Sequence, residues 1–442
     1  MMRSLFSGVA GLRTHQTKMD VIGNNIANVN TVAYKSQSVT FQDLMYQTTA
    51  NASGANAETG RGGVNAKQIG LGVTMGAIST SITTSGASQS TGNPFDIQIK
   101  GDAFFVVSDG NDNYFTRAGA FYVDGAGNLA MTSTGYTVMG WQEDPTRPGT
   151  IIKDTVTPLK IMSAENMESK PEQTTAAYLS GVIDKNSTQL ESDDGLIVNI
   201  SVYDSLGYSY MLKCSIKPDT AGTGDTNDYT LSFTKLLDAD GEDTGAELPE
   251  AITLKYDKET GALKEPTGTT DLTIATGTGA DLTAFTAPIK LDVSTTTMYD
   301  NKGTSTIKGT SGDLEGNYAG RKMGEMSGVS VQTDGKIYAS YTNGTTKLLG
   351  QIAVATFANP SGLEKEGENL YSATMNSGEF DGIGVDITGT GGSMTTGVLE
   401  MSNVDLSAEF TDMITTQRGF QANSRIITVS DTLLEELINL KR

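Results

Sequence analysis

Histidine and cysteine each occur once in this 442-residue chain, as His15 and Cys214. A Cys-His or Ser-His-Asp catalytic arrangement would have to rest on these two residues, which lie far apart in the sequence. His15 falls within a helical pattern, so we favour a polar position at a helix interface over catalysis. Cys214 lies in the alternating run 210–216 and is predicted to be a small core residue on a strand, with a reactive or cross-linking thiol as the alternative. One cysteine excludes an intramolecular disulfide and any multi-cysteine metal site.

Acidic residues could support two other kinds of chemistry. The segment Asp238-Ala-Asp-Gly-Glu-Asp243 resembles part of a calcium loop, in which alternate carboxylates supply oxygen ligands. It lacks the full twelve-residue spacing, and its flanks do not have the pattern of paired helices, so an acidic β-turn is the favoured interpretation. A glycosidase needs a pair of carboxyl groups, and no spacing singles one out.

Two glycine-containing sequences, Gly222-Thr-Gly224 and Gly277-Thr-Gly279, are candidate phosphate loops. A phosphate-binding loop is followed directly by a helix, and neither sequence precedes a helical pattern. We therefore predict turns at both places. The sequence predicts no catalytic residues, no cofactor and no metal site.

Charge and hydropathy exclude further classes of protein. The net charge of −21 argues against nucleic-acid binding, which needs clustered Lys and Arg, and favours solubility. No stretch approaches 18 uncharged apolar residues, and the N-terminus lacks the apolar core of a signal peptide. We expect neither membrane insertion nor a cleaved Sec-type signal.

Both ends of the chain are predicted to form amphipathic helices. Near the start, apolar residues recur at separations of 3, 4 or 7, within an arc of roughly 160°. The end has a heptad seam interrupted by Gln417, Ser424 and Asp431, with Asp405 as its N-cap. The predicted assembly interface consists of Leu5, Val9, Leu12, Met19, Ile22, Ile26 and Val29 with Leu406, Phe410, Met413, Phe420, Ile427, Leu434 and Ile438.

The first helix is predicted to be weak in isolation. It contains Gly8, Gly11 and Gly23, and each interior glycine costs about 1 kcal/mol relative to alanine. The same small residues allow two backbones to approach closely, so we expect the ends to order on assembly. Core helices of a monomeric domain are the alternative.

Between the ends, the sequence has the patterns of β-structure. Phe95–Ile99 alternates apolar and polar residues, Ala103–Val107 is typical of a buried strand, and Asp124-Gly125 marks a hairpin turn. The predicted fold is mainly β with terminal α-helices that pair as a coiled coil, in a nested multidomain architecture. Its predicted parts are the paired helices (1–35 and 400–442), an extended linker (36–90), a discontinuous β-domain (91–157 and 322–399) and an inserted β-domain (158–321).

Both ends resemble those of flagellar rod and hook proteins. The run from Ser4 to Lys35 resembles the start of these proteins, above all in Asn-Asn-Ile-Ala-Asn at 24–28 and Ala-Tyr-Lys at 33–35. The stretch 403–425 resembles their closing helix. The chain is therefore identified as a member of the flagellar rod and hook family.

The interior distinguishes hook from rod within this family. The stretch 92–119 is similar to both, whereas Val202-Tyr-Asp-Ser-Leu-Gly207 and 350–363 resemble hook subunits in particular. The resemblance implies a non-enzymatic structural subunit that polymerises into a flexible curved tube and transmits torque from rod to filament. A distal rod or hook-associated protein is the alternative, and a secreted calcium-binding adhesin or carbohydrate-active enzyme is a more remote one.

The resemblance also implies location and partners. The location is the hook of the bacterial flagellum. The partners are other copies of the chain, the rod, the hook cap, the hook-filament junction proteins and the flagellar type III export apparatus. Phe41, Leu44 and Tyr46 are similar to a short aromatic motif that early flagellar substrates present to the export gate. The alternative is that these side chains anchor the linker.

Overall fold

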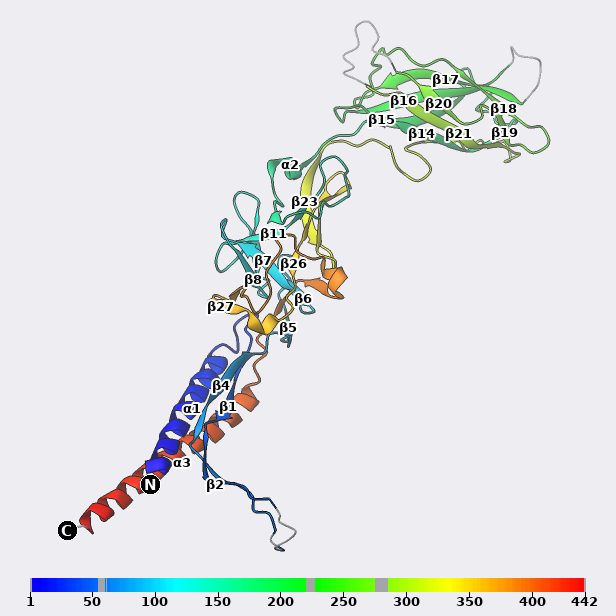
Figure 1. Cartoon of the computed structure of the whole chain (residues 1–442). Coiled ribbons are helices and arrows are strands. Elements are labelled where there is room, and N and C mark those ends of the chain that lie inside the picture. The colour runs from blue at the N-terminus through cyan, green and yellow to red at the C-terminus, as the bar shows by residue number, and fades with distance from the viewer. Residues whose placement is uncertain (1, 55–59, 61, 220–226, 275–284, 441–442) are drawn as a thin grey trace. The chain divides into compact units, whose positions relative to one another are not determined.

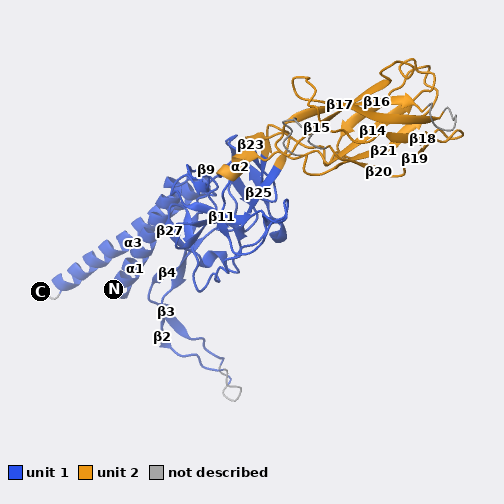
Figure 2. Ribbon diagram, turned by 90° about the horizontal axis from the view of Figure 1, so that it is seen from above, with its two compact units in different colours: residues 1–163, 329–339, 347–442 blue, residues 164–328, 340–346 orange. Residues whose placement is uncertain are grey.

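The computed structural model describes residues 2–54, 60, 62–219, 227–274 and 285–440. The chain divides into two compact units, which are coloured separately in Figure 2. Unit 1 comprises 1–163, 329–339 and 347–442, and unit 2 comprises 164–328 and 340–346. The predicted turns at Gly222–Gly224 and Gly277–Gly279 lie outside the described residues.

Two long helices form the ends of unit 1. Helix α1 spans Met2–Ala27 and α3 spans Leu406–Asn439, and Figure 1 shows them side by side. The Asp405 carboxylate accepts hydrogen bonds from the backbone N–H groups of Ser407 and Ala408. This satisfies two donors at the start of the helix, so the predicted N-cap is confirmed.

The segment 36–90, predicted as an extended linker, contains paired strands. Strand β1 (Gln37–Asp43) pairs antiparallel with β4 (Val73–Thr80), and β2 (Tyr46–Ala50) pairs antiparallel with β3 (Lys67–Gly70). Strands β2 and β3 are exposed on both faces. Because neither strand has a buried apolar face, neither has the alternating pattern by which strands are recognised in a sequence.

The β-core of unit 1 is built from both flanks of the chain. Its elements are β5 (Ser88–Ser90), β6 (Ile97–Lys100), β7 (Phe104–Ser108), β8 (Asn113–Thr116), β9 (Phe121–Val123), β10 (Leu129–Met131), β11 (Thr137–Gln142), β12 (Thr157–Pro158), β25 (Thr346–Ile352), β26 (Val354–Ala355), η1 (Pro360–Gly362), β27 (Glu364–Gly367), β28 (Leu370–Ser372), η2 (Ile387–Thr390), β29 (Ser393–Thr396) and β30 (Val398–Glu400). Strand β11 pairs with β7 and β25, β6 pairs with β29, and β5 pairs with β30. Phe104, Phe115 and Trp141 lie in its buried core.

Unit 2 contains two sheets around one apolar core. Its strands are β14 (Ala176–Ile183), β15 (Leu196–Tyr203), β16 (Ser209–Pro218), β17 (Asp228–Leu237), β18 (Ile252–Tyr256), β19 (Leu263–Glu265), β20 (Thr269–Leu272), β21 (Ile289–Met298) and β22 (Lys308–Ser311). One sheet has the order β15-β16-β17-β18-β19, and the other has the order β20-β21-β14-β22. Alternate residues of β15, including Val198 and Ile200, are buried in this core, as expected for strands with one apolar face.

The remaining elements lie where the chain passes between the units. They are α2 (Ala164–Met167), β13 (Glu168–Ser169), β23 (Gly324–Val331) and β24 (Lys336–Tyr341), with β13 paired to β23. The mainly β fold with terminal helices is confirmed. The finer four-part division stays a prediction, because compactness separates the chain only into the two units above.

Candidate assembly interface

Helices α1 and α3 pair antiparallel through residues with small side chains. Ser4 Oγ lies 3.5 Å from Ser430 Oγ. A Cβ atom on Gly11 would lie 2.7 Å from Asn423 Nδ2. Residue numbers thus rise along α1 as they fall along α3. Because the contacts include glycine, the two backbones approach more closely than a seam of leucines would allow.

On α3 the side that faces α1 follows a heptad. Its buried and half-buried positions include the series Glu409, Met413, Thr416, Phe420, Asn423, Ile427, Ser430 and Leu434, separated alternately by four and three residues. Gly419 and Ser424, beside this series, are also half-buried. The predicted positions Met413, Phe420, Ile427 and Leu434 belong to this seam. The polar residues of this series are Thr416, Asn423 and Ser430, each one residue before a predicted interruption. Of the predicted interruptions, Ser424 is half-buried, whereas Gln417 and Asp431 are exposed.

The other predicted interface residues differ in how far they are buried. Leu406, Phe410 and Ile438 are exposed. On α1, Ile22 is buried, Leu5, Val9, Leu12, Met19 and Ile26 are half-buried, and Val29 follows the end of the helix. The most buried positions of α1 also include Gly8, Gly11, Thr14 and Asn25, so its seam is mainly small or polar.

Many large apolar side chains of the helix pair are left on its outer surface. On α3, 50% of Phe410, 60% of Ile414 and 57% of Val429 are exposed. Further exposed apolar residues of the two helices are Met2, Phe6, Leu406, Ile426, Leu433, Leu437, Ile438 and Leu440. We call these eleven residues the outer apolar face. A face of this kind, uncovered by the described part of the chain, is typical of a protein interaction surface. None of the helices in the described residues has the length and apolar character needed to cross a membrane.

Asn25 joins α1 to both of its neighbours. Its side-chain amide donates to Glu409 Oε1 and to the carbonyl of Gln37, both at 2.8 Å, and its Oδ1 accepts from the Gln37 N–H at 3.0 Å. Tyr34 Oη donates to the same oxygen. Burial raises the pKa of Glu409, and the hydrogen bond from Asn25 lowers it in part. One asparagine of the 24–28 motif thus ties α1, β1 and α3 together.

His15 lies within the helix pair, as the sequence predicted. Its ring contacts Phe41 edge-on, with centroids 5.4 Å apart. Its Nδ1 atom is buried and has no hydrogen-bond partner among the described residues. Burial lowers the pKa of His15, and the nearby Lys18 lowers it further. This environment favours the neutral ring.

The predicted export residues Phe41, Leu44 and Tyr46 are all partly exposed. Phe41 lies on β1, Tyr46 begins β2, and Leu44 lies between these strands. Their side chains are accessible, and their recognition by an export gate stays a prediction.

The acidic turn at Asp238 uses its carboxylate internally. Asp238 Oδ1 accepts hydrogen bonds from the N–H groups of Asp240 and Glu242, which favours the predicted turn over a calcium loop. The same i+2 and i+4 pattern occurs at Asp124, Asp204 and Asp313. No cluster of His, Cys, Asp or Glu able to hold a metal ion occurs within the described ranges.

Cys214 occupies the core of unit 2, on β16, with none of its surface exposed. Burial raises the pKa of its thiol to about 12. This agrees with the favoured interpretation of a core residue, because reactive cysteines need an accessible thiolate.

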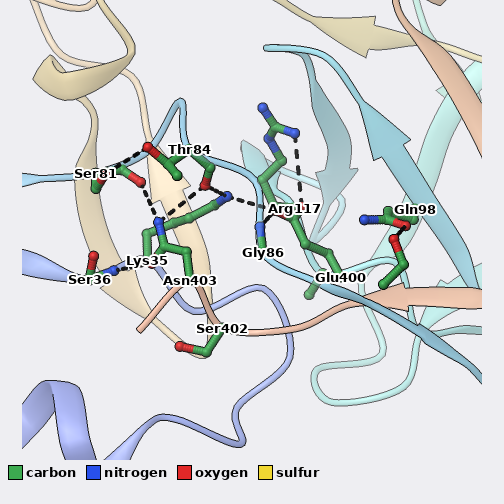
Figure 3. Close-up of polar contacts among 12 residues, drawn as sticks. Lys35, Ser36, Ser81, Thr84, Gly86, Gln98, Arg117, Glu400, Ser402 and Asn403 are labelled. Atoms are coloured by element: carbon green, nitrogen blue, oxygen red, sulfur yellow. Dashed lines mark hydrogen bonds and ion pairs between the residues drawn. The ribbon is translucent and has the colours of Figure 1, made fainter. Parts of the chain in front are cut away.

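A buried charge cluster, which sequence reasoning missed, lies where the helices join the β-core. Figure 3 shows Glu400 between Lys35 and Arg117. Lys35 Nζ lies 2.7 Å from Glu400 Oε1, and Arg117 NH1 lies 3.9 Å from Glu400 Oε2. All three side chains are almost fully buried. Burial lowers the pKa of Lys35, whereas the hydrogen bond to Glu400 raises it.

Three family models match the chain. The flagella basal body rod protein model matches residues 5–35, the flagellar hook protein FlgE/F/G D1 domain matches 98–167, and the flagellar basal body rod FlgEFG protein C-terminal model matches 395–440. These segments cover α1 and its exit, part of the β-core, and α3. Together with the fold, they define a flagellar axial protein of the rod and hook class.

Full-length relatives specify the family further. The chain is 35% identical to the flagellar hook protein FlgE of Treponema pallidum over 483 residues and 37% identical to that of Borreliella burgdorferi over 472 residues, with all of each chain covered. It is also 31% identical to the flagellar basal-body rod protein FlgG of Bacillus subtilis. The solved structure of Helicobacter pylori flagellar hook protein FlgE2 aligns over 71% of this chain and 100% of that one, with a TM-score of 0.46 and 13% identity. On the full-length identities, this chain belongs to the flagellar hook protein family and is a structural subunit of the hook.

Proposed function

We propose that this chain polymerises into a curved, flexible tube that transmits torque from the rod to the filament. The observation that carries the proposal is the distribution of side chains on the helix pair. The pair closes its own seam with small and polar residues together with apolar ones such as Ile22 and Phe420, and it leaves the outer apolar face available to neighbouring copies. A head-to-tail contact that does not close on itself generates a helical polymer of this kind.

The charge distribution supports a layered tube. Within the proposed tube, the terminal helices form the inner wall, the β-core of unit 1 forms the next layer, and unit 2 lies outermost. Unit 2 contains 27 Asp and Glu against 13 Lys and Arg, a net charge of −14. Like-charged surfaces repel and stay hydrated, which suits contacts that slide as the tube bends.

Partners and export follow from the same proposal. The chain acts without catalysis and binds other copies of itself, the rod, the hook cap and the hook-filament junction proteins. It leaves the cell through the flagellar type III apparatus without a cleaved signal peptide, with Phe41, Leu44 and Tyr46 as the export motif. Their partial exposure supports this role.

A distal rod subunit is the second candidate, because the chain is also similar to a rod protein. Removal of unit 2 separates the two functions. A hook lacking its outer layer should lose its regular curvature, whereas a straight rod does not need that layer. Electron microscopy of flagellar bases from cells that carry the shortened chain distinguishes these outcomes.

The assembly proposal is tested by concentrating the purified chain and imaging it by electron microscopy. The wild-type chain should form short curved tubes. The variant Ile414→Asp/Val429→Asp, which changes only the outer apolar face, should stay monomeric with an unchanged circular dichroism spectrum. The exposed polar residue Gln421 provides the control, since Gln421→Asp should still assemble. Normal tubes from the double variant would refute the proposal.

A further inference from the structure

Three separate stretches of chain connect the helix pair to the β-core, and Glu400 touches all of them. They are 28–36 after α1, 80–87 after β4 and 400–405 before α3. Glu400 Oε1 accepts hydrogen bonds from Lys35 Nζ at 2.7 Å and from the Gly86 N–H at 2.9 Å. Lys35 Nζ also donates to the Thr84 carbonyl at 2.8 Å. Figure 3 shows these side chains converging from the different segments.

Asn403 makes a second set of links among the same three stretches. Its Oδ1 accepts from the Ser36 N–H at 2.7 Å. Its amide donates to the carbonyls of Ser81 at 2.9 Å and Thr84 at 3.1 Å. The backbones are joined directly as well, since the Ala33 N–H donates to the Glu400 carbonyl at 2.8 Å.

The converging stretches are in turn fixed to the β-core. Arg117, next to Glu400, donates through NH2 to the Gly101 carbonyl at 2.6 Å and lies over the Phe104 ring, 5.0 Å from its centroid. From the other flank, the Asn369 amide donates to the Val32 carbonyl at 2.9 Å. The joint therefore has partners on both flanks of the core.

Burial makes this joint stiff. Glu400 and Lys35 are each 1% exposed, so any movement that separates them leaves a charge without water or a counter-charge. The backbones are also too close to slide past one another, because a Cβ on Gly86 would lie 1.9 Å from the Met401 carbonyl oxygen. Alternative geometries of the joint are therefore costly.

We propose that Glu400 is the central residue of a rigid polar clamp that fixes the terminal helix pair to the β-core of unit 1. The clamp comprises Lys35, Thr84, Gly86, Arg117, Glu400 and Asn403. The two parts of unit 1 move as one body, so bending of the assembled tube takes place at other contacts. That last consequence rests on the proposed function, whereas the stiffness of the joint does not.

Distance measurements by pulsed electron paramagnetic resonance on the full-length monomer test the clamp. Spin labels are placed at Gln16→Cys on α1 and Tyr122→Cys on β9, both exposed positions, in a Cys214→Ala background. With Glu400 intact, the distance distribution should be narrow. With Glu400→Gln it should broaden by about twofold or more, because the two buried cations lose their shared anion.

Two controls locate the effect. A label pair at Gln16 and Gln421 reports on the helix pair itself, and its distribution should be unchanged by Glu400→Gln. The variant Glu265→Gln breaks an exposed ion pair of unit 2 and should leave both distributions narrow. If Glu400→Gln does not fold, Lys35→Met replaces it and should broaden the Gln16–Tyr122 distribution.

An equally narrow distribution in the clamp variant, or a broad one with Glu400 intact, would overturn the proposal. Because the monomer is measured, the result does not depend on tube formation. Failure of the chain to assemble would count against the proposed function and leave the clamp standing.

Discussion

The imidazole ring of His15 packs against the backbone of Gly419, so closely that a Cβ atom on Gly419 would lie 2.6 Å from His15 Cε1. The same ring also contacts the ring of Phe41 on β1 edge-on, with centroids 5.4 Å apart. His15 therefore has little room to move away, and the separation between α1 and α3 at this level depends on the absence of a side chain at position 419.

Gly419→Ala should accordingly destabilise the helix pair although it raises helix propensity. Gly23→Ala is the matched control, because a Cβ there meets no atom within 4 Å and the residue is exposed on the same pair of helices. The control should gain about 1 kcal/mol from the helix propensity of alanine. Urea unfolding followed by circular dichroism at 222 nm measures both changes. A gain of equal size for both variants would show that the contact with His15 imposes no constraint.

The sequence predicted the heptad of α3 only in part, for a geometrical reason. Apolar residues seven apart, such as Met413 and Phe420, identify the seam. The seam position between them can come either three or four residues after Met413, and a heptad allows both. Only the contacts with α1 select Thr416 over Gln417 as the intervening position. Polar side chains at these positions provide no hydropathy signal that could decide between them.

The buried charge cluster could not be predicted because its members are brought together by tertiary structure alone. Lys35, Arg117 and Glu400 belong to segments that lie far apart in the sequence, and a charged residue in a sequence is ordinarily expected at the surface. The Ala-Tyr-Lys motif singled out Lys35 without indicating its partner. Strands β2 and β3 were missed for the opposite reason, since both of their faces are exposed and carry no alternation.

His15 should make the stability of the chain depend on pH near neutrality. Its pKa in the folded chain is lowered from the ordinary value of 6.5, so the unfolded chain binds the proton more readily. The stabilising contribution of neutral His15 is full above pH 6.5 and is lost as the pH falls below that value. Lys18 is the charged residue whose repulsion adds to the effect of burial on this pKa. The other charged residues closest to His15 in the sequence of α1 are Arg13 and Asp20, and the elements packed against α1 carry Asp43 on β1 and Glu409, Asp412, Arg418 and Arg425 on α3.

His15→Gln is the variant that isolates this effect, because His15 is the only histidine. The midpoint of urea unfolding is compared between pH 8 and pH 5.5. Wild type should lose more stability than His15→Gln over this interval, since the two chains share every other titratable group. Parallel losses in the two chains would assign the pH dependence to titratable groups other than His15.

The ion pair between Lys153 and Asp386 should stabilise the β-core in a pH-dependent way at acidic pH. Burial alone would raise the pKa of Asp386, but hydrogen bonds from Lys153 Nζ at 2.7 Å and from Thr388 lower it from 3.8 to about 2. This contribution is full above pH 3.8 and is lost as the pH falls towards 2. Half of the Lys153 side chain is exposed, so the ion pair contributes about 1 kcal/mol or less to the free energy of unfolding.

Trp141 reports on this pair, because Lys153 Nζ lies 5.6 Å from the centroid of its ring and the chain has no other tryptophan. Unfolding of Lys153→Met, followed by Trp141 fluorescence, should show a loss of stability at pH 6 that shrinks by pH 2.5. Lys235→Met breaks the exposed pair with Asp243 in unit 2 and should leave the Trp141 transition unchanged. A loss of the same size at both pH values would instead implicate the contact between Lys153 and the indole ring.

Glu400→Gln should be among the most destabilising single changes in unit 1. The variant keeps the size of the side chain but leaves Lys35 and Arg117 as buried cations without their shared carboxylate. Breaking a buried pair in this way costs about 3–5 kcal/mol, whereas breaking an exposed pair costs about 1 kcal/mol or less. Glu265→Gln, which removes the exposed partner of Lys255, is the matched control. Chemical unfolding followed by Trp141 fluorescence measures the first change, and circular dichroism measures the second.

The double variant Lys35→Met/Glu400→Gln separates charge from packing. If the cost of Glu400→Gln comes from stranding a cation, removing Lys35 as well should recover part of the lost stability, because one of the two unpaired charges is then gone. Simple addition of the two single losses would mean that Lys35 and Glu400 act independently. In that case the 2.7 Å contact between them would not be what holds the helix pair to the β-core.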